Sequence, residues 1–151
     1  MSRPPRIPNW LPWETSTIYF ITLCVEDRKR VLAKQRAWKI CRSVLDRLDQ
    51  WTILFAIAMP DHLHILAAPL DRDASLSDFA KWFKRWFNEA YRLPSKPMAW
   101  CWQEGCFDRL LRLEESLSEK WEYLRQNPVR AGLVADPDDW PCQFQFNEGE
   151  L

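Results

Sequence analysis

The chain has 151 residues, with 21 lysines and arginines against 21 aspartates and glutamates, so its formal net charge is zero. This length predicts one domain spanning residues 1–151. The charge balance excludes nucleic-acid binding through a global positive field and leaves only local basic patches. The five cysteines form no C-x-x-C pair, which favours reduced thiols over a disulfide framework or a zinc site. The sequence has no secretory signal and no apolar run of membrane-spanning length, which predicts a cytoplasmic protein without a membrane partner.

The first half of the chain predicts an arm, a strand, a helix and a hairpin. Residues 1–16 hold four prolines and predict an extended arm. Residues 16–25 are β-branched and aromatic, which predicts a strand. Residues 36–50 repeat apolar positions at helical spacing. Two apolar segments, 51–59 and 62–68, then predict a hairpin that turns at Pro60 and Asp61.

The second half predicts two more helices and one more strand. Ser75 is the expected N-cap of a helix that runs to about Arg92, with Asp78 completing a capping box. Residues 106–113 predict a fourth strand. A last helix begins at Ser116 or Ser118 and ends near Asn127, and the tail 135–151 is expected to be a docked coil. The order predicts an α+β fold of the ferredoxin-like β-α-β-β-α-β type with an antiparallel sheet and an additional C-terminal helix.

The two histidines of the chain stand two residues apart in the segment "MPDHLHILAAP". Side chains alternate across a strand, so His62 and His64 are expected on the same face. Two adjacent imidazoles can hold one divalent metal ion, each through one ring nitrogen. The alternative is that both are ordinary strand residues.

The last predicted helix supplies further candidates. Leu117, Trp121 and Leu124 form an apolar stripe that predicts the core-facing side. Tyr123 and Asn127 are four residues apart and share a neighbouring face. An amide oxygen is a hard metal ligand, and a phenol is a nucleophile once its proton is removed or its target is polarised. The alternative for Tyr123 is a half-buried packing residue.

Three segments together carry a family resemblance: "MPDHLHILAAP", "WQEGCFDRLLR" and "YLRQNPVRAGLV". They resemble the single-tyrosine HUH transposases, and the last segment resembles most the REP-associated tyrosine transposases. The resemblance covers roughly residues 3–145. It implies that His62, His64 and Asn127 are metal ligands for Mg²⁺ or Mn²⁺ and that Tyr123 is the nucleophile. Asp61 departs from the family pattern, which more often has asparagine there, and it is expected either to add charge near the metal or to cap the turn.

The resemblance also implies an activity and a partner. The expected activity is metal-dependent nicking and rejoining of single-stranded DNA at palindromic hairpins through a 5′-phosphotyrosine, by a monomer or a homodimer. Glu119 is a candidate general base. Eight basic residues are candidate DNA contacts: Arg3, Arg6, Lys84, Arg85, Arg109, Arg112, Arg125 and Arg130.

Two other functions remain open from the residues alone. The first is a non-catalytic module of ferredoxin-like fold that binds single-stranded nucleic acid. The paired aromatic pattern of an RNP motif is missing from the first and fourth strands, which argues against the RNA-binding version of this module. The second is a hydrolase that uses a metal on the two histidines and water as the nucleophile. Such an enzyme would not need Tyr123.

Overall fold

The computed structural model describes residues 3–5, 17–71, 73–111 and 114–146. Within these residues the chain builds one antiparallel sheet in the order β4-β1-β3-β2-β5. The strands are β1 (Ile18–Cys24), β2 (Trp51–Met59), β3 (His62–Pro69), β4 (Phe107–Leu111) and β5 (Gln143–Gln145). The helices are α1 (Gln35–Arg47), α2 (Leu76–Tyr91), α3 (Glu114–Arg125) and α4 (Asn127–Arg130), with 3-10 turns η2 (Glu26–Arg28) and η3 (Pro137–Asp139).

The order β1-α1-β2-β3-α2-β4, with β1 and β3 at the centre of the four predicted strands, confirms the ferredoxin-like pattern. The hairpin of β2 and β3 turns at Pro60 and Asp61 as expected. The Ser75 hydroxyl accepts a hydrogen bond of 3.0 Å from the Asp78 amide, which confirms the predicted start of α2. The additional helix α3 carries Tyr123, also as expected.

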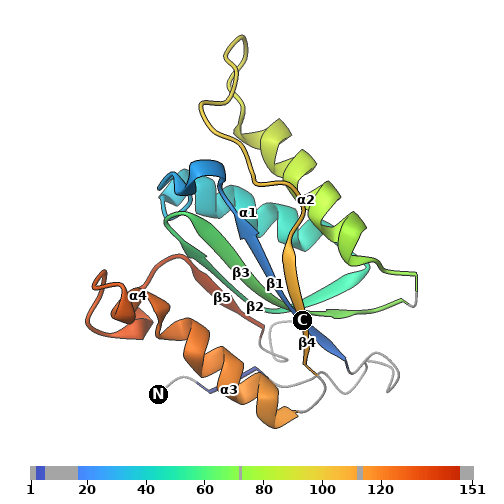
Figure 1. Cartoon of the computed structure of the whole chain (residues 1–151), viewed down its shortest axis with the longest axis vertical. Helices are drawn as coiled ribbons and strands as arrows, with labels where there is room; N and C mark the ends of the chain where they lie inside the picture. Colours follow the sequence, from blue (N-terminus) through green and yellow to red (C-terminus); the bar gives the residue numbers. More distant parts are fainter. Residues whose placement is uncertain (1–2, 6–16, 72, 112–113, 147–151) are drawn as a thin grey trace.

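The sheet separates two layers (Figure 1). On one face, α1 and α2 pack against alternate strand residues, including Leu63, Ile65 and Ala67 of β3. On the other face, α3 packs against the intervening residues, such as Leu66. Side chains two or four positions apart on a strand point to the same face. His62 and His64 therefore point toward the α3 layer, as Leu66 does.

The stripe predicted for α3 is the one that holds it on the sheet. Leu117, Trp121 and Leu124 are all buried in a cluster with residues of β1, β2, β3 and β4. Burial of an indole and two leucines supplies several kcal/mol of apolar stabilisation, of order 1.5–3 kcal/mol per side chain. In the described part of the chain, no helix combines the length and the apolar composition needed to cross a bilayer.

The tail differs from its prediction. Residues 135–146 do not remain a coil: they form η3 and the edge strand β5, which pairs with β2 through residues 55–57. The Trp140 indole donates a 3.0 Å hydrogen bond to the Ala58 carbonyl, which helps to seat this segment. A three-residue strand has too short a pattern to be seen in sequence, and it forms here because the edge of β2 offers unpaired backbone groups. The predicted arm at 6–16 lies outside the described residues.

Candidate functional site

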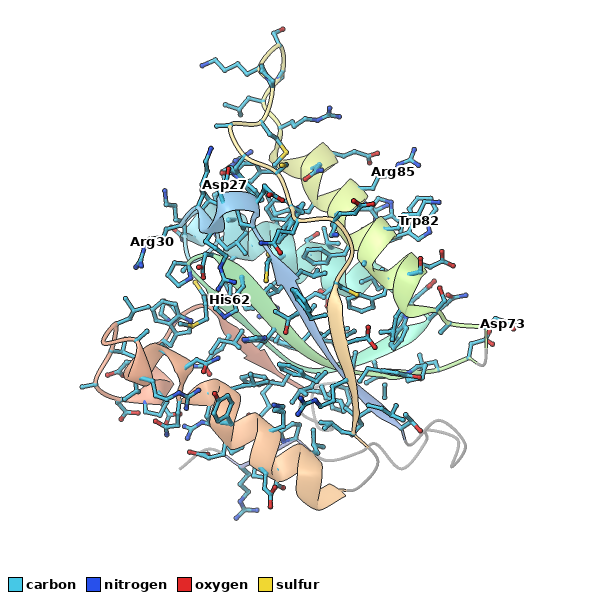
Figure 2. The ribbon with its side chains drawn as sticks, in the orientation of Figure 1. Asp27, Arg30, His62, Asp73, Trp82 and Arg85 are labelled. Carbon is cyan, nitrogen blue, oxygen red and sulfur yellow. The ribbon has the colours of Figure 1, made fainter. Side chains whose placement is uncertain are left out.

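His62 and His64 lie side by side on β3, on the sheet face covered by α3 and α4. Their ring centroids are 4.5 Å apart and their planes meet at 74°. Figure 2 shows His62 between the segment that carries Asp27 and Arg30 and the layer formed by α3 and α4. The predicted pair of imidazoles on one face is therefore present, and both residues are partly buried and lie outside the two core clusters.

The Nδ1 atom of each ring has a partner. His62 Nδ1 donates to Asp61 Oδ1 over 2.7 Å, and Asp61 in turn accepts a 2.8 Å hydrogen bond from Arg28 Nε. His64 Nδ1 and the Thr22 hydroxyl are 2.8 Å apart and hydrogen-bonded. A metal-binding histidine commonly uses one ring nitrogen for an orienting partner and the other for the ion. This arrangement leaves Nε2 of both rings as the candidate metal-binding atoms.

Both histidines are held in the neutral form that binds metal ions. Burial lowers the pKa of His62 despite the hydrogen bond and charge of Asp61, which raise it. Burial, with smaller contributions from His62 and Lys120, lowers the pKa of His64 to about 3. Burial raises the pKa of Asp61, but hydrogen bonds from Arg28 and His62 outweigh it and lower that pKa overall. Neutral imidazoles beside an ionised carboxylate are therefore the state at physiological pH.

Tyr123 lies on α3, over the same sheet face. Its side chain is 57% exposed, so it is not the half-buried packing residue of the alternative interpretation. Lys120 connects it to the histidines: the Lys120 ammonium lies 4.5 Å from the Phe20 ring and 5.3 Å from the Tyr123 ring. Phe20 stacks on His64 with ring centroids 5.1 Å apart. The order of contacts is thus His64, Phe20, Lys120 and Tyr123.

Asn127 begins α4, immediately after α3, and its amide is engaged by Arg130. The Arg130 guanidinium donates to the Asn127 amide oxygen and, over 2.7 Å, to the Tyr123 carbonyl. The same guanidinium lies 4.0 Å from the centre of the Tyr123 ring. The structure therefore brings Tyr123 and Asn127 together around one arginine, and the contacts it gives Asn127 are with Arg130 rather than with the histidines.

The donor set fits a divalent ion only in part. Among the described residues, no cluster of three or more histidine, cysteine or carboxylate side chains is placed to hold a metal. Two imidazoles remain, and Mg²⁺ and Mn²⁺ fill their other positions with oxygen donors such as water or phosphate. The two histidines are thus suited to an ion that takes its remaining ligands from water or from the phosphate of a substrate.

Among the described residues, Arg109 and Arg130 are predicted DNA contacts that adjoin this site. Arg109 is exposed on β4, directly opposite Phe20 in the pairing of β4 with β1, so it shares the histidine face. Arg130 is exposed and lies against Tyr123. For Arg125 the structure differs from the sequence prediction of a DNA contact. It is only 8% exposed and pairs with Glu122 and Asp138, so its guanidinium ties η3 to α3 instead of facing solvent.

The remaining basic candidates lie elsewhere. Lys84 donates to the carbonyls of Gln103 and Gly105 and so anchors the loop before β4 to α2. Arg85 pairs with Glu89 and points outward beside Trp82, away from His62 (Figure 2). The Arg3 carbonyl accepts a hydrogen bond from Gln145, whereas Arg6 and Arg112 lie outside the described residues.

Sequence reasoning missed Lys120, Thr22 and Arg28. Lys120 precedes Tyr123 by three residues, so helical spacing alone places it on the same side of α3. Thr22 contacts the histidines from strand β1, and Arg28 contacts them from turn η2. The contact of Thr22 depends on the register of β1 with β3, which pairs Thr22 with His64. No local pattern in the sequence indicates that register.

Comparison with known proteins finds a relative named for the family that the sequence motifs resemble. A curated protein of Haemophilus influenzae (strain ATCC 51907 / DSM 11121 / KW20 / Rd), whose name assigns it provisionally to the REP-associated tyrosine transposases, is 22% identical over 138 residues, which are 82% of this chain and 77% of that protein. No family model matches the chain.

Two solved structures share the fold. The structure of a REP-associated tyrosine transposase bound to a REP hairpin superposes with a TM-score of 0.71 at 20% identity, over 95% of this chain and 82% of that one. A crystal structure from Deinococcus radiodurans R1, described provisionally as a transposase, superposes with a TM-score of 0.53 at 17% identity, over 80% of this chain and 95% of that one. The α+β fold predicted from sequence is therefore confirmed.

Proposed function

We propose that this chain acts as a REP-associated tyrosine transposase, a transesterase that cuts and rejoins single-stranded DNA at hairpins formed by palindromic repeats. One observation carries the proposal: two neutral imidazoles, oriented through Nδ1, lie on the sheet face over which the exposed Tyr123 is mounted. The likeness to a transposase solved with a REP hairpin supports the choice of DNA substrate.

The two histidines would hold Mg²⁺ or Mn²⁺ through Nε2. The bound ion would supply Lewis acidity at the scissile phosphate. Asp61 and Thr22 keep the rings in place, and Arg28 balances the charge of Asp61. Asn127 would join the ligand set only when its amide oxygen leaves Arg130, and we expect its contribution to be smaller than that of either histidine.

Tyr123 would carry the covalent step. Its phenolic oxygen attacks the phosphorus, the bond from phosphorus to the 3′-oxygen breaks, and the 5′-phosphate remains on the tyrosine. The phenolic proton passes to solvent, which reaches the exposed ring, and the departing 3′-oxygen takes up a proton. One phosphodiester replaces another, so the step needs no nucleotide cofactor and can run backwards to rejoin the strand. Glu119, exposed one turn earlier on α3, remains a candidate base.

Two cations would stabilise the charge on the attacking phenol and on the phosphate. Arg130 lies 4.0 Å from the Tyr123 ring centre and Lys120 lies 5.3 Å from it. Positive groups already in position stabilise developing negative charge without reorganisation. This arrangement favours nucleophilic use of Tyr123 over a purely structural role.

The decisive experiment is a covalent-adduct assay. The protein is incubated with a labelled single-stranded hairpin oligonucleotide and Mn²⁺ and is resolved on a denaturing gel. We expect the wild type to form an adduct and Tyr123→Phe to form none, because only the nucleophilic hydroxyl is removed. Oligonucleotide binding and thermal stability are expected to be unchanged in Tyr123→Phe.

A matched control removes a different hydroxyl. Tyr91→Phe, on α2 in the other layer, is expected to form the adduct at the wild-type rate. Cleavage by Tyr123→Phe without an adduct would instead favour the hydrolase in which water is the nucleophile. Binding without cleavage by any variant, in either metal, would leave a non-catalytic DNA-binding module.

A further inference from the structure

One row of the sheet extends from the histidine pair to an exposed aromatic ring. His64 pairs with Thr22 across β3 and β1, and Thr22 pairs with Phe107 across β1 and β4. Residues directly opposite in antiparallel strands project from the same face, so all three side chains share the histidine face. Two strand spacings of about 4.8 Å place the Phe107 backbone roughly 10 Å from that of His64.

Phe107 is 66% exposed, although it belongs to the sheet. The residues at alternate positions further along the strand are covered to different degrees: Arg109 is exposed and Leu111 is buried under α3. A single exposed apolar residue is common on protein surfaces and needs no explanation by itself. What distinguishes Phe107 is that it ends the row that contains His64 and belongs to β4, an edge strand of the sheet that the described residues form.

Positive charge accompanies this ring. Arg109 lies two residues along β4 on the same face, opposite Phe20, and the Lys120 ammonium lies over Phe20. Burial lowers the pKa of Lys120, and the nearby charge of Arg109 lowers it further, which shows that the two cations share one region. An exposed ring on a sheet face that also carries two cations matches the chemistry of unpaired DNA, whose bases stack on aromatic side chains while its phosphates are neutralised.

We propose that Phe107 is the stacking platform for an unpaired nucleobase next to the scissile phosphate, and that Arg109 contacts the phosphate of the same nucleotide. This inference rests on the function proposed above, since it assigns the path of the single strand toward the histidines. Stacking on a phenyl ring does not read base identity, so Phe107 fixes the position of the strand rather than its sequence.

The test measures binding separately from cleavage. A hairpin oligonucleotide with a single-stranded extension carries 2-aminopurine at successive unpaired positions, and Tyr123→Phe is the background, so no strand is cut. We expect one position to be quenched on binding. Adding Phe107→Leu should abolish that quenching and weaken binding about tenfold, whereas Phe107→Trp should retain both.

Two controls make the result specific. Leu93→Ala removes an equally prominent apolar side chain, 55% exposed, from the loop that projects beyond the end of α2 in Figure 1, and it should bind like the wild type. An abasic nucleotide at the quenched position should weaken the wild type and leave Phe107→Leu unchanged, because the ring and the base act as a pair.

The outcomes separate this proposal from the proposed function. Two results would overturn the stacking role and leave the transposase activity standing: unchanged oligonucleotide binding when Phe107→Leu is added to the Tyr123→Phe background, and wild-type adduct formation by Phe107→Leu with Tyr123 intact. Loss of quenching in Phe107→Leu would support the stacking role, even if the wild type formed no adduct. A change of sedimentation from dimer to monomer in Phe107→Leu, with binding unchanged, would assign the ring to an interface between copies and overturn the proposal.

Discussion

Asp61 lies between the cation Arg28 and the imidazole of His62, and it accepts a hydrogen bond from each. Its carboxylate therefore places negative charge one hydrogen bond away from a candidate metal ligand, which is the first of the two roles that the sequence left open. Such an outer partner fixes the ring and raises the basicity of the nitrogen that binds the ion.

We expect Asp61→Ala to weaken Mn²⁺ binding by about tenfold or more, the usual effect of removing an orienting partner. Asp61→Asn keeps an oxygen that can accept from His62 and should lose less. Titration of Mn²⁺ into the protein, followed by electron paramagnetic resonance of the free ion, measures both. Equal affinity in Asp61→Ala and the wild type would mean that the carboxylate serves only the turn.

The two histidines should behave as one unit. His62→Ala and His64→Ala are each expected to lose most of the cleavage activity, and the double variant should be little worse than either, because a pair that binds one ion fails when one member is missing. Asn127→Ala should be milder, since water can replace an amide oxygen. Cleavage is measured over a range of Mg²⁺ and Mn²⁺ concentrations, with EDTA as the blank. Undiminished cleavage in EDTA would contradict the metal site.

At the scale of elements, α3 is held in two ways: its apolar stripe packs on the sheet, and Arg125 links its last turn to η3. Arg125 is 8% exposed, lies 4.9 Å from the Trp121 ring centre, and pairs with Asp138 from the tail. The tail, through Asp138 of η3, therefore stabilises the position of the helix that carries Tyr123.

Arg125→Ala is expected to lower the free energy of unfolding by about 1–3 kcal/mol. The loss is smaller than for a fully buried pair because the carboxylate side chains are about half exposed, at 49% for Asp138 and 51% for Glu122. Arg85→Ala, which breaks the exposed pair with Glu89, should change it by no more than about 0.5 kcal/mol and serves as the control. Urea denaturation gives both values. Similar effects for the two variants would mean that the Arg125 ion pairs do not stabilise the attachment of α3.

The same elements show what the sequence could predict. Strands and helices with long local patterns, such as 51–59 and the helix after Ser75, were correctly expected because burial and capping act over neighbouring residues. The pair of histidines on one strand face and the position of Tyr123 beside the apolar stripe of its helix also follow from local spacing. Arg125 was misassigned and β5 was missed because both depend on contacts with distant residues, Asp138 for the first and the edge of β2 for the second.

At the scale of the whole molecule, zero net charge and a few local cations would set the mode of the proposed DNA binding. Arg109, Lys120 and Arg130 surround the site, whereas Arg125 is paired with an acid and Lys84 with backbone carbonyls. A protein of this kind has no long-range field to attract duplex DNA.

We therefore expect a palindromic hairpin with an unpaired extension to bind more tightly than a random duplex of the same length. Three phosphate contacts predict a slope of about −2 for the logarithm of affinity against the logarithm of salt concentration. Arg109→Ala should make the slope shallower by about 0.7. Fluorescence anisotropy over a salt series measures these values. Equal affinity for duplex and hairpin would contradict recognition by local patches.

The two layers of the fold differ in how firmly they are attached. The layer of α1 and α2 is joined to the sheet by a large cluster rich in aromatic rings, whereas, among the described side chains, α3 contributes only Leu117, Trp121 and Leu124 to a smaller one. Partial opening of a protein begins where the least apolar area is lost. Backbone amides of α3 should thus exchange with deuterium well before those of β2 and β3, so the layer that carries Tyr123 is expected to open locally at the lowest free-energy cost.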